Sequence, residues 1–187
     1  MEGKYNLVMH AGASVPADVQ VKVLELYASC FRPAPFGWTM LQGDIADPKV
    51  ATFAELLLRY LQADSTLIAI FDPHKDLAAF SILLKFDEIF DPVSVGLAEF
   101  GARHGDNYFA LACVAEACRQ QGLYELMIEK RSELCDRRRT MWVRTHVEHH
   151  VVQRTYQTLG FEIAGSFAAN IGGVQTPYVA LSKSTVN

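Results

Sequence analysis

The stretch "ACRQQGLYELM", from Ala117 to Met127, combines residue types that bind anions with the start of a helical pattern. The first amides of a helix have no acceptor within the helix and lie at the positive end of its dipole. Gly122 allows the backbone to approach a bulky group closely, and Arg119 adds a positive charge. The spacing favours a diphosphate-binding turn, although an isolated Arg-x-x-Gly is also typical of an ordinary turn with a solvated arginine.

The elements that must position this turn alternate between strand and helix patterns. The segment "NYFALACVA" before the turn has almost no polar alternation, which is typical of a central strand covered on both faces. The long linker before it is expected to hold a short helix near 96–102. Helices are predicted over 17–31, 47–61, 123–138 and 152–159. Strands are predicted over 5–10, 66–72, 76–86, 107–115, 140–147, 161–168 and 176–184. This order predicts a mixed sheet with helices on its faces.

Two segments together resemble the signatures of the GCN5-related N-acetyltransferase (GNAT) superfamily. In "CVAEACRQQGLYELMIEK", Arg119 and Gly122 match the family's pyrophosphate segment. In "HHVVQRTYQTLGF", Tyr156, Gly160 and Phe161 match the end of a later helix. The order of elements follows the family fold over nearly the whole chain. The resemblance implies one α/β (α+β) domain over residues 1–187, with a mixed, mostly antiparallel seven-stranded sheet, about four helices and splayed central strands.

The resemblance also implies acetyl-CoA as a co-substrate. Its pantetheine would pair with the fourth-strand backbone, and its pyrophosphate would lie against the Arg-x-x-Gly turn. Two positions depart from the family pattern: Tyr124 replaces a small residue, and His149 replaces an asparagine. The residues expected at the coenzyme are Ala112, Cys113, Val114, Arg119, Gln120, Gln121, Gly122, Leu123, Tyr124 and His149.

The activity that the resemblance implies is direct transfer of an acetyl group to a primary amine of a small molecule. By position, Tyr156 would act as the general acid that protonates the departing thiolate, unless it only packs on the apolar face of its helix. The general base stays open. Its candidates are a bound water and the side chains of Asp106, Tyr108, His146 and Glu148, which lie at or near the ends of the two central strands.

Two other interpretations compete with an acyltransferase. The cluster "HVEHH" places His146 and His150 four residues apart, but Val147 stands where a helical zinc protease site needs glutamate, so no metal is expected. The second alternative is a catalytically silent module of the same fold that binds coenzyme A or another small ligand in a regulatory role. Tyr124 favours this module, because its side chain could crowd the pyrophosphate.

Composition restricts the partners. With 17 basic and 21 acidic residues the net charge is -4, so neither a nucleic acid nor an anionic membrane is an expected partner. We see no leader pattern and no apolar run of roughly 20 residues, so we expect a cytoplasmic protein. The four cysteines are expected to be reduced, with Cys118 the candidate for a lowered thiol pKa. Phe36 and Trp38, in a proline-rich loop, are candidates for binding the amine acceptor, and a homodimer stays open.

Overall fold

The computed structural model describes residues 4–31, 55, 57–171 and 174–184. Within them, seven strands form one sheet in the order β1-β2-β3-β4-β5-β7-β6, and β4 and β5 are its parallel pair. This confirms the predicted mixed, mostly antiparallel sheet. The strands are β1 (Asn6–Ala11), β2 (Ser65–Phe71), β3 (Leu77–Lys85), β4 (Asn107–Val114), β5 (Met141–His146), β6 (Glu162–Ile171) and β7 (Val174–Lys183).

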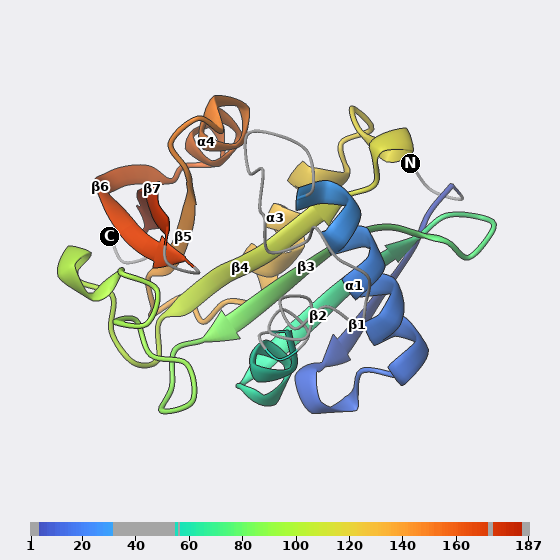
Figure 1. Ribbon diagram of the computed structural model, residues 1–187, viewed down its shortest axis with the longest axis horizontal. Coiled ribbons are helices and arrows are strands. Elements are labelled where there is room, and N and C mark those ends of the chain that lie inside the picture. The colour runs from blue at the N-terminus through green and yellow to red at the C-terminus, as the bar shows by residue number, and fades with distance from the viewer. Residues whose placement is uncertain (1–3, 32–54, 56, 172–173, 185–187) are drawn as a thin grey trace.

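Helices cover both faces of the sheet. In Figure 1, α1 (Ala17–Phe31) crosses the near face of β2 to β4, and α3 (Leu123–Leu134) lies behind the sheet. Residues 57–62 are helical and lie near α1, and α4 (His150–Thr158) precedes β6. Three short 3-10 turns complete the described elements: η1 (Gly12–Ser14), η3 (Ala98–Phe100) and η4 (Glu116–Cys118). No described helix is both long enough and apolar enough to pass through a bilayer.

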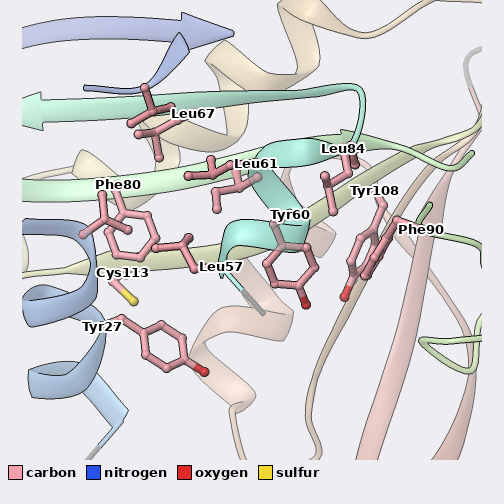
Figure 2. Close-up of a cluster of buried hydrophobic side chains, with 14 of the residues drawn as sticks. Tyr27, Leu57, Tyr60, Leu61, Leu67, Phe80, Leu84, Phe90, Tyr108 and Cys113 are labelled. Carbon is pink, nitrogen blue, oxygen red and sulfur yellow. The ribbon is translucent and has the colours of Figure 1, made fainter. Parts of the chain in front are cut away.

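The central position predicted for the fourth strand is confirmed, because β4 has three strands on each side. Its first three residues are buried, whereas residues 110–112 and Val114 are only partly buried. On the near face its side chains join the largest core cluster. Figure 2 shows Tyr108 and Cys113 in this cluster with Tyr27 of α1 and with Leu57 and Tyr60.

The end predicted for α3 was wrong. The helix stops at Leu134 rather than near Arg138, because Cys135 takes an extended conformation and the Asp136 carboxylate accepts the Arg138 backbone N–H at 2.9 Å. The buried side of α3 also differs from a plain apolar stripe. Leu134 is 45% exposed, whereas Arg131 is completely buried.

The linker between β3 and β4 packs onto β6, the strand at one edge of the sheet. Its predicted short helix is present as η3. Gly96 has a φ of +74°, and a β-carbon there would collide with the Phe167 ring of β6. In return, the Phe100 ring occupies the space that a β-carbon on Gly165 of β6 would need. The linker is therefore fixed against β6 by close contacts rather than left as an open loop.

Candidate active site

The two parallel strands separate after a short shared ladder. Only three pairs join β4 to β5, from Asn107 opposite Met141 to Phe109 opposite Val143. Beyond these pairs β4 stays bonded to β3, and β5 stays bonded to β7. The facing edges of β4 and β5 are therefore unpaired from residue 110 and residue 144 onward, which agrees with the splayed central strands expected from the sequence.

A β-bulge in β4 coincides with this separation. Ser81 pairs with Ala112 and Leu83 pairs with Phe109, so β4 carries one extra residue between these two pairs. Ala115 donates its N–H to Ala78, and polar groups alternate between the two edges of an antiparallel strand. The backbone groups of Ala112 and Val114 therefore face away from β3, toward the open edge. This is the edge that an extended chain carrying amide groups can pair with.

The turn after β4 contains two residues with a left-handed backbone. η4 leads into Arg119, and then Gln120 and Gly122 adopt left-handed conformations with φ of 60° and 73°. Gly122 is also the N-cap of α3 and carries no side chain that could cap the helix.

The amides of this loop have no acceptor within the described chain. The first backbone bond of α3 runs from the Leu126 N–H to the Gly122 carbonyl, and none of the six amides from Gln120 to Glu125 has a bonded acceptor among the described residues. The Gln121 side chain is engaged elsewhere, since its Oε1 accepts from Lys4 Nζ at 2.7 Å and from the Tyr5 hydroxyl at 2.8 Å. Gln121 thus braces the loop with its side chain and leaves its N–H available.

Tyr124 lies against another tyrosine. Its ring meets the Tyr156 ring edge-on, with centroids 6.1 Å apart and an interplanar angle of 84°. Burial, followed by the neighbouring Tyr156, holds the pKa of the Tyr124 phenol well above its ordinary value. The side chain is directed along α3 toward α4, and this orientation weakens the argument that it crowds a ligand at the loop.

Tyr156 is buried in the core between α3, α4 and the sheet. It is 1% exposed, beside the partly buried Val152 and Leu159, and its hydroxyl oxygen accepts a hydrogen bond from Arg131 Nη2 at 3.1 Å. The side chain therefore packs on the apolar face of α4, which was one of the two expectations for this residue. Because Arg131 donates to the oxygen, the phenol keeps its own hydrogen for donation. Its acid role stays a prediction.

Arg131 is a residue that sequence reasoning missed. Its guanidinium lies 4.4 Å from the centre of the Phe109 ring, and its Nε donates to the Met127 carbonyl at 3.2 Å. Its Nη1 is buried without any hydrogen-bond partner in the described residues. The signal in the sequence was position: Arg131 follows Met127 by four residues and Ile128 by three, so helical spacing puts a charge on the buried stripe.

The candidate bases Asp106 and Tyr108 lie at the paired end of β4. The Asp106 carboxylate accepts from the Trp142 indole N–H at 3.2 Å and from two backbone amides, those of Arg103 and Thr140. The Tyr108 hydroxyl belongs to a buried side chain, and burial raises its pKa. A phenol that resists ionisation is a poor proton acceptor, and the Asp106 carboxylate already accepts from three donors.

The candidates His146 and Glu148 lie at the open end of β5. His146 Nδ1 accepts the Glu148 N–H at 3.3 Å, and the imidazole meets the His149 ring edge-on at 6.2 Å. Glu148 is exposed. Burial, and then the neighbouring His146, lowers the pKa of His149, so this imidazole is neutral at pH 7. His149 is the N-cap of α4 but makes no side-chain capping bond.

A thiol with a lowered pKa lies on α1, at a cysteine that the sequence did not single out. The pKa of Cys30 on α1 is lowered to about 7, mainly by hydrogen bonding with Cys113, and burial raises the pKa of Cys113 itself. Cys30 Sγ also contacts the Val114 carbonyl at 3.4 Å, next to the open edge of β4. Spacing along the chain did not bring Cys30 and Cys113 together; only the packing of α1 on β4 does.

Other predicted residues lie outside the part of the chain that the structure describes. The acceptor candidates Phe36 and Trp38 are among these undescribed residues, as is the start of the helix predicted over 47–61. Among the described residues, no group of three or more His, Cys, Asp and Glu side chains is arranged to hold a metal ion.

Comparison with known proteins identifies the fold. No protein-family model matches the chain, and no curated protein matches its sequence. A structure from Corynebacterium glutamicum, described as histone acetyltransferase HPA2 and related acetyltransferase, has a TM-score of 0.67 at 13% identity and covers 97% of this chain and 96% of its own. A ribosomal-protein-alanine N-acetyltransferase from Brucella melitensis has a TM-score of 0.66 at 10% identity, over 95% of this chain and 99% of its own. A phosphinothricin acetyltransferase from Sinorhizobium meliloti in complex with AcCoA has a TM-score of 0.61 at 14% identity, over 95% of this chain and 87% of its own.

Proposed function

The chain has the fold of the GCN5-related N-acetyltransferase superfamily, and from this premise we propose that it is an acyl-CoA-dependent N-acyltransferase. In this proposal it moves an acetyl group from acetyl-CoA to a primary amine of a small molecule. The observation that carries the proposal is the row of six amides from Gln120 to Glu125, which have no acceptor in the described residues. Such a row, at the start of a helix and directly after the open edge of β4, suits a diphosphate followed by an amide-bearing chain.

The chemistry needs one bond exchange and two proton transfers. The amine nitrogen attacks the thioester carbonyl, so a carbon–nitrogen bond forms as the carbon–sulfur bond breaks. Tyr156 then gives its hydrogen to the departing sulfur, and Arg131 stabilises the negative charge that develops on the phenol oxygen, to which it already donates at 3.1 Å. The proton lost by the amine passes to a water or to the side chain of His146 or Glu148 at the open end of β5.

Calorimetry with matched glycine variants tests the coenzyme site. Gly122→Glu should weaken acetyl-CoA binding by at least tenfold, about 1.4 kcal/mol, because a carboxylate would meet the diphosphate. Gly101→Glu is the control: Gly101 also has a left-handed φ, +100°, and a β-carbon there meets no atom within 4 Å. Equal affinity in the two variants would remove the loop from the binding site.

Release of free thiol separates the enzyme from the regulatory module. The wild-type protein is mixed with acetyl-CoA and a panel of primary amines, and thiol is measured with a chromogenic disulfide. An acyltransferase releases thiol in proportion to the acceptor. Saturable binding of acetyl-CoA with no amine-dependent thiol would instead support the catalytically silent module.

A further inference from the structure

Arg144 lies where the two central strands separate. It follows Val143, the last residue of β5 that pairs with β4, and it pairs on its other side with Ala180 of β7. Its side chain lies on the near face of the sheet, among residues of the core cluster that includes Tyr108. Tyr156 and Arg131 lie on the opposite face, among the side chains that pack with Ile128 of α3.

The guanidinium of Arg144 has only neutral neighbours in the described structure. Its Nη1 donates to the Val95 carbonyl at 2.9 Å, and its central carbon lies 4.8 Å from the centre of the Tyr178 ring. The phenols of Tyr108 and Tyr60 are further neighbours. No ion pair joins Arg144 to a carboxylate among the described residues.

The described neighbours of Arg144 leave some of its donors without a hydrogen-bond acceptor. A guanidinium carries five N–H groups, and the neighbours of Arg144 use only part of them. Arg144 is partly buried, and none of its nitrogens belongs to the described side-chain atoms that are buried without a partner, whereas Nη1 of Arg131 does. Donors without an acceptor, on a cation removed from most of its water, form strong charge-assisted bonds with an anion.

We propose that Arg144 binds the carboxylate of the acceptor, and hence that the acceptor is an amine of the amino-acid class. The inference rests on the proposed acyl transfer and deepens it. The open edge of β4 begins one residue after Phe109, opposite Arg144, so an amine close to the transferred acyl group would place a carboxylate a few atoms away beside the guanidinium. Arginine is suited to this role because its planar fork matches the two oxygens of a carboxylate.

Matched acceptor pairs test the substrate class. Free amino acids are compared with their amides, which keep the amine and the side chain and lose the negative charge. Wild-type kcat/KM should be at least tenfold higher for the acids, mainly through KM, and Arg144→Gln should abolish the difference while it leaves the amides unchanged. Arg144→Lys should keep part of the preference, and Arg154→Gln, which removes an exposed arginine on α4, should keep all of it. Equal use of acids and amides, or an equal loss for both in Arg144→Gln, overturns the inference.

A binding measurement keeps the inference separate from the proposed activity. Differential scanning fluorimetry of the wild type with the same acids and amides should show stabilisation by at least one acid and by none of the amides. Arg144→Gln should lose that stabilisation. If no acceptor gives thiol release but acids still bind through Arg144, the acyl transfer fails and the carboxylate site stands. If thiol release occurs and the acids do not bind in preference to amides, the carboxylate site fails and the acyl transfer stands.

Discussion

The two faces of the sheet each hold an arginine against an aromatic ring, but in different states. Arg131, behind the sheet, is completely buried and lies 4.4 Å from the Phe109 ring, and Arg144, on the near face, is partly buried and lies 4.8 Å from the Tyr178 ring. Neither has a carboxylate partner among the described residues. Arg131 donates one N–H to the Tyr156 oxygen and another to a carbonyl, whereas Arg144 donates to the Val95 carbonyl and has further donors without a described acceptor.

The difference separates two uses of a buried cation. A charge without a counter-ion inside a protein costs several kcal/mol, so packing alone does not explain Arg131. Its position beside the phenol of Tyr156, which we propose as the general acid, gives a reason for keeping it. The desolvation cost of Arg144 is smaller because the side chain is only partly buried, and its remaining donors are available to a ligand. We therefore expect substitutions of Arg131 to change turnover and substitutions of Arg144 to change acceptor affinity.

The largest effect is expected at the linker that provides the Val95 carbonyl to Arg144. Gly96→Ala should lower the free energy of unfolding by about 3 kcal/mol, because the new methyl group collides with Phe167 and the left-handed φ is unfavourable for alanine. Gly101→Ala has the φ cost without the collision and should lose about 1 kcal/mol. Urea denaturation measures both. Equal losses would mean that the linker is not clamped and that the setting of Arg144 is less rigid than that of Arg131.

Tyr156→Phe tests the proton transfer on the Arg131 face. Turnover should fall by about 100-fold, because a general acid typically contributes at least this factor, while acetyl-CoA affinity stays nearly unchanged. Steady-state rates of thiol release and calorimetry on the same preparation give the two values. Unchanged turnover would reduce Tyr156 to a packing residue and would leave Arg131 without a functional explanation.

Arg131→Met sharpens the same point, because it should separate stability from activity. Turnover should fall by about tenfold in the wild-type background and by nothing further in Tyr156→Phe. The free energy of unfolding should stay level or rise by about 1 kcal/mol, because an apolar side chain replaces an uncompensated buried charge. Arg154→Met, at an exposed site on α4, is the matched control. An equal loss of turnover in both backgrounds would show that Arg131 does not act through the tyrosine.

The smallest effect concerns the alkylation of Cys30, on the near face of the sheet. Since the pKa of Cys30 is lowered to about 7, its thiolate should predominate above that pH, and alkylation by iodoacetamide should reach half its maximal rate near pH 7. Cys113 and Cys135 have raised pKa values and should stay unmodified in the folded protein. Peptide mass spectrometry after timed labelling measures each site. Replacing Cys113 with serine should shift the Cys30 profile to higher pH, and a profile centred near 9 in the wild type would contradict the contact between the two thiols.

Local patterns predicted most of the fold, because they report burial within one element. Unbroken apolar runs identified the buried hairpin of β2 and β3 and the central strand β4, and Gly160, with a φ of +86°, ends α4 as expected. The end of α3 was not predicted correctly, because it depends on a hydrogen bond between the Asp136 carboxylate and a nearby amide rather than on periodicity. The order β5-β7-β6 depends on pairing between strands that are far apart in the sequence, and a single sequence does not show which residues pair.

The candidate site was predictable only where its function lies in the backbone. Gly122 indicated a turn that a bulky group could approach, and in the structure it lies in a turn with a left-handed φ of 73°. Arg131 and Arg144 were missed, because their meaning comes from partners on other elements: Tyr156 lies 25 residues beyond Arg131, and the Val95 carbonyl lies 49 residues before Arg144. Whether a charged residue is solvated or enclosed is decided by packing, which residue type does not reveal.

The extra residue in β4 affects whether the backbone groups on its open edge bond to β5 or to a ligand. The bulge lies between Phe109, which still pairs with β5, and Ala112, which does not, and bulges bend a strand and increase its twist. A chain lacking one residue here, such as Ala110, would run straight and could continue its ladder with β5. The sheet would then be more stable and closed, because the backbone of β5 would pair with the edge of β4 that the bulge leaves open to a ligand.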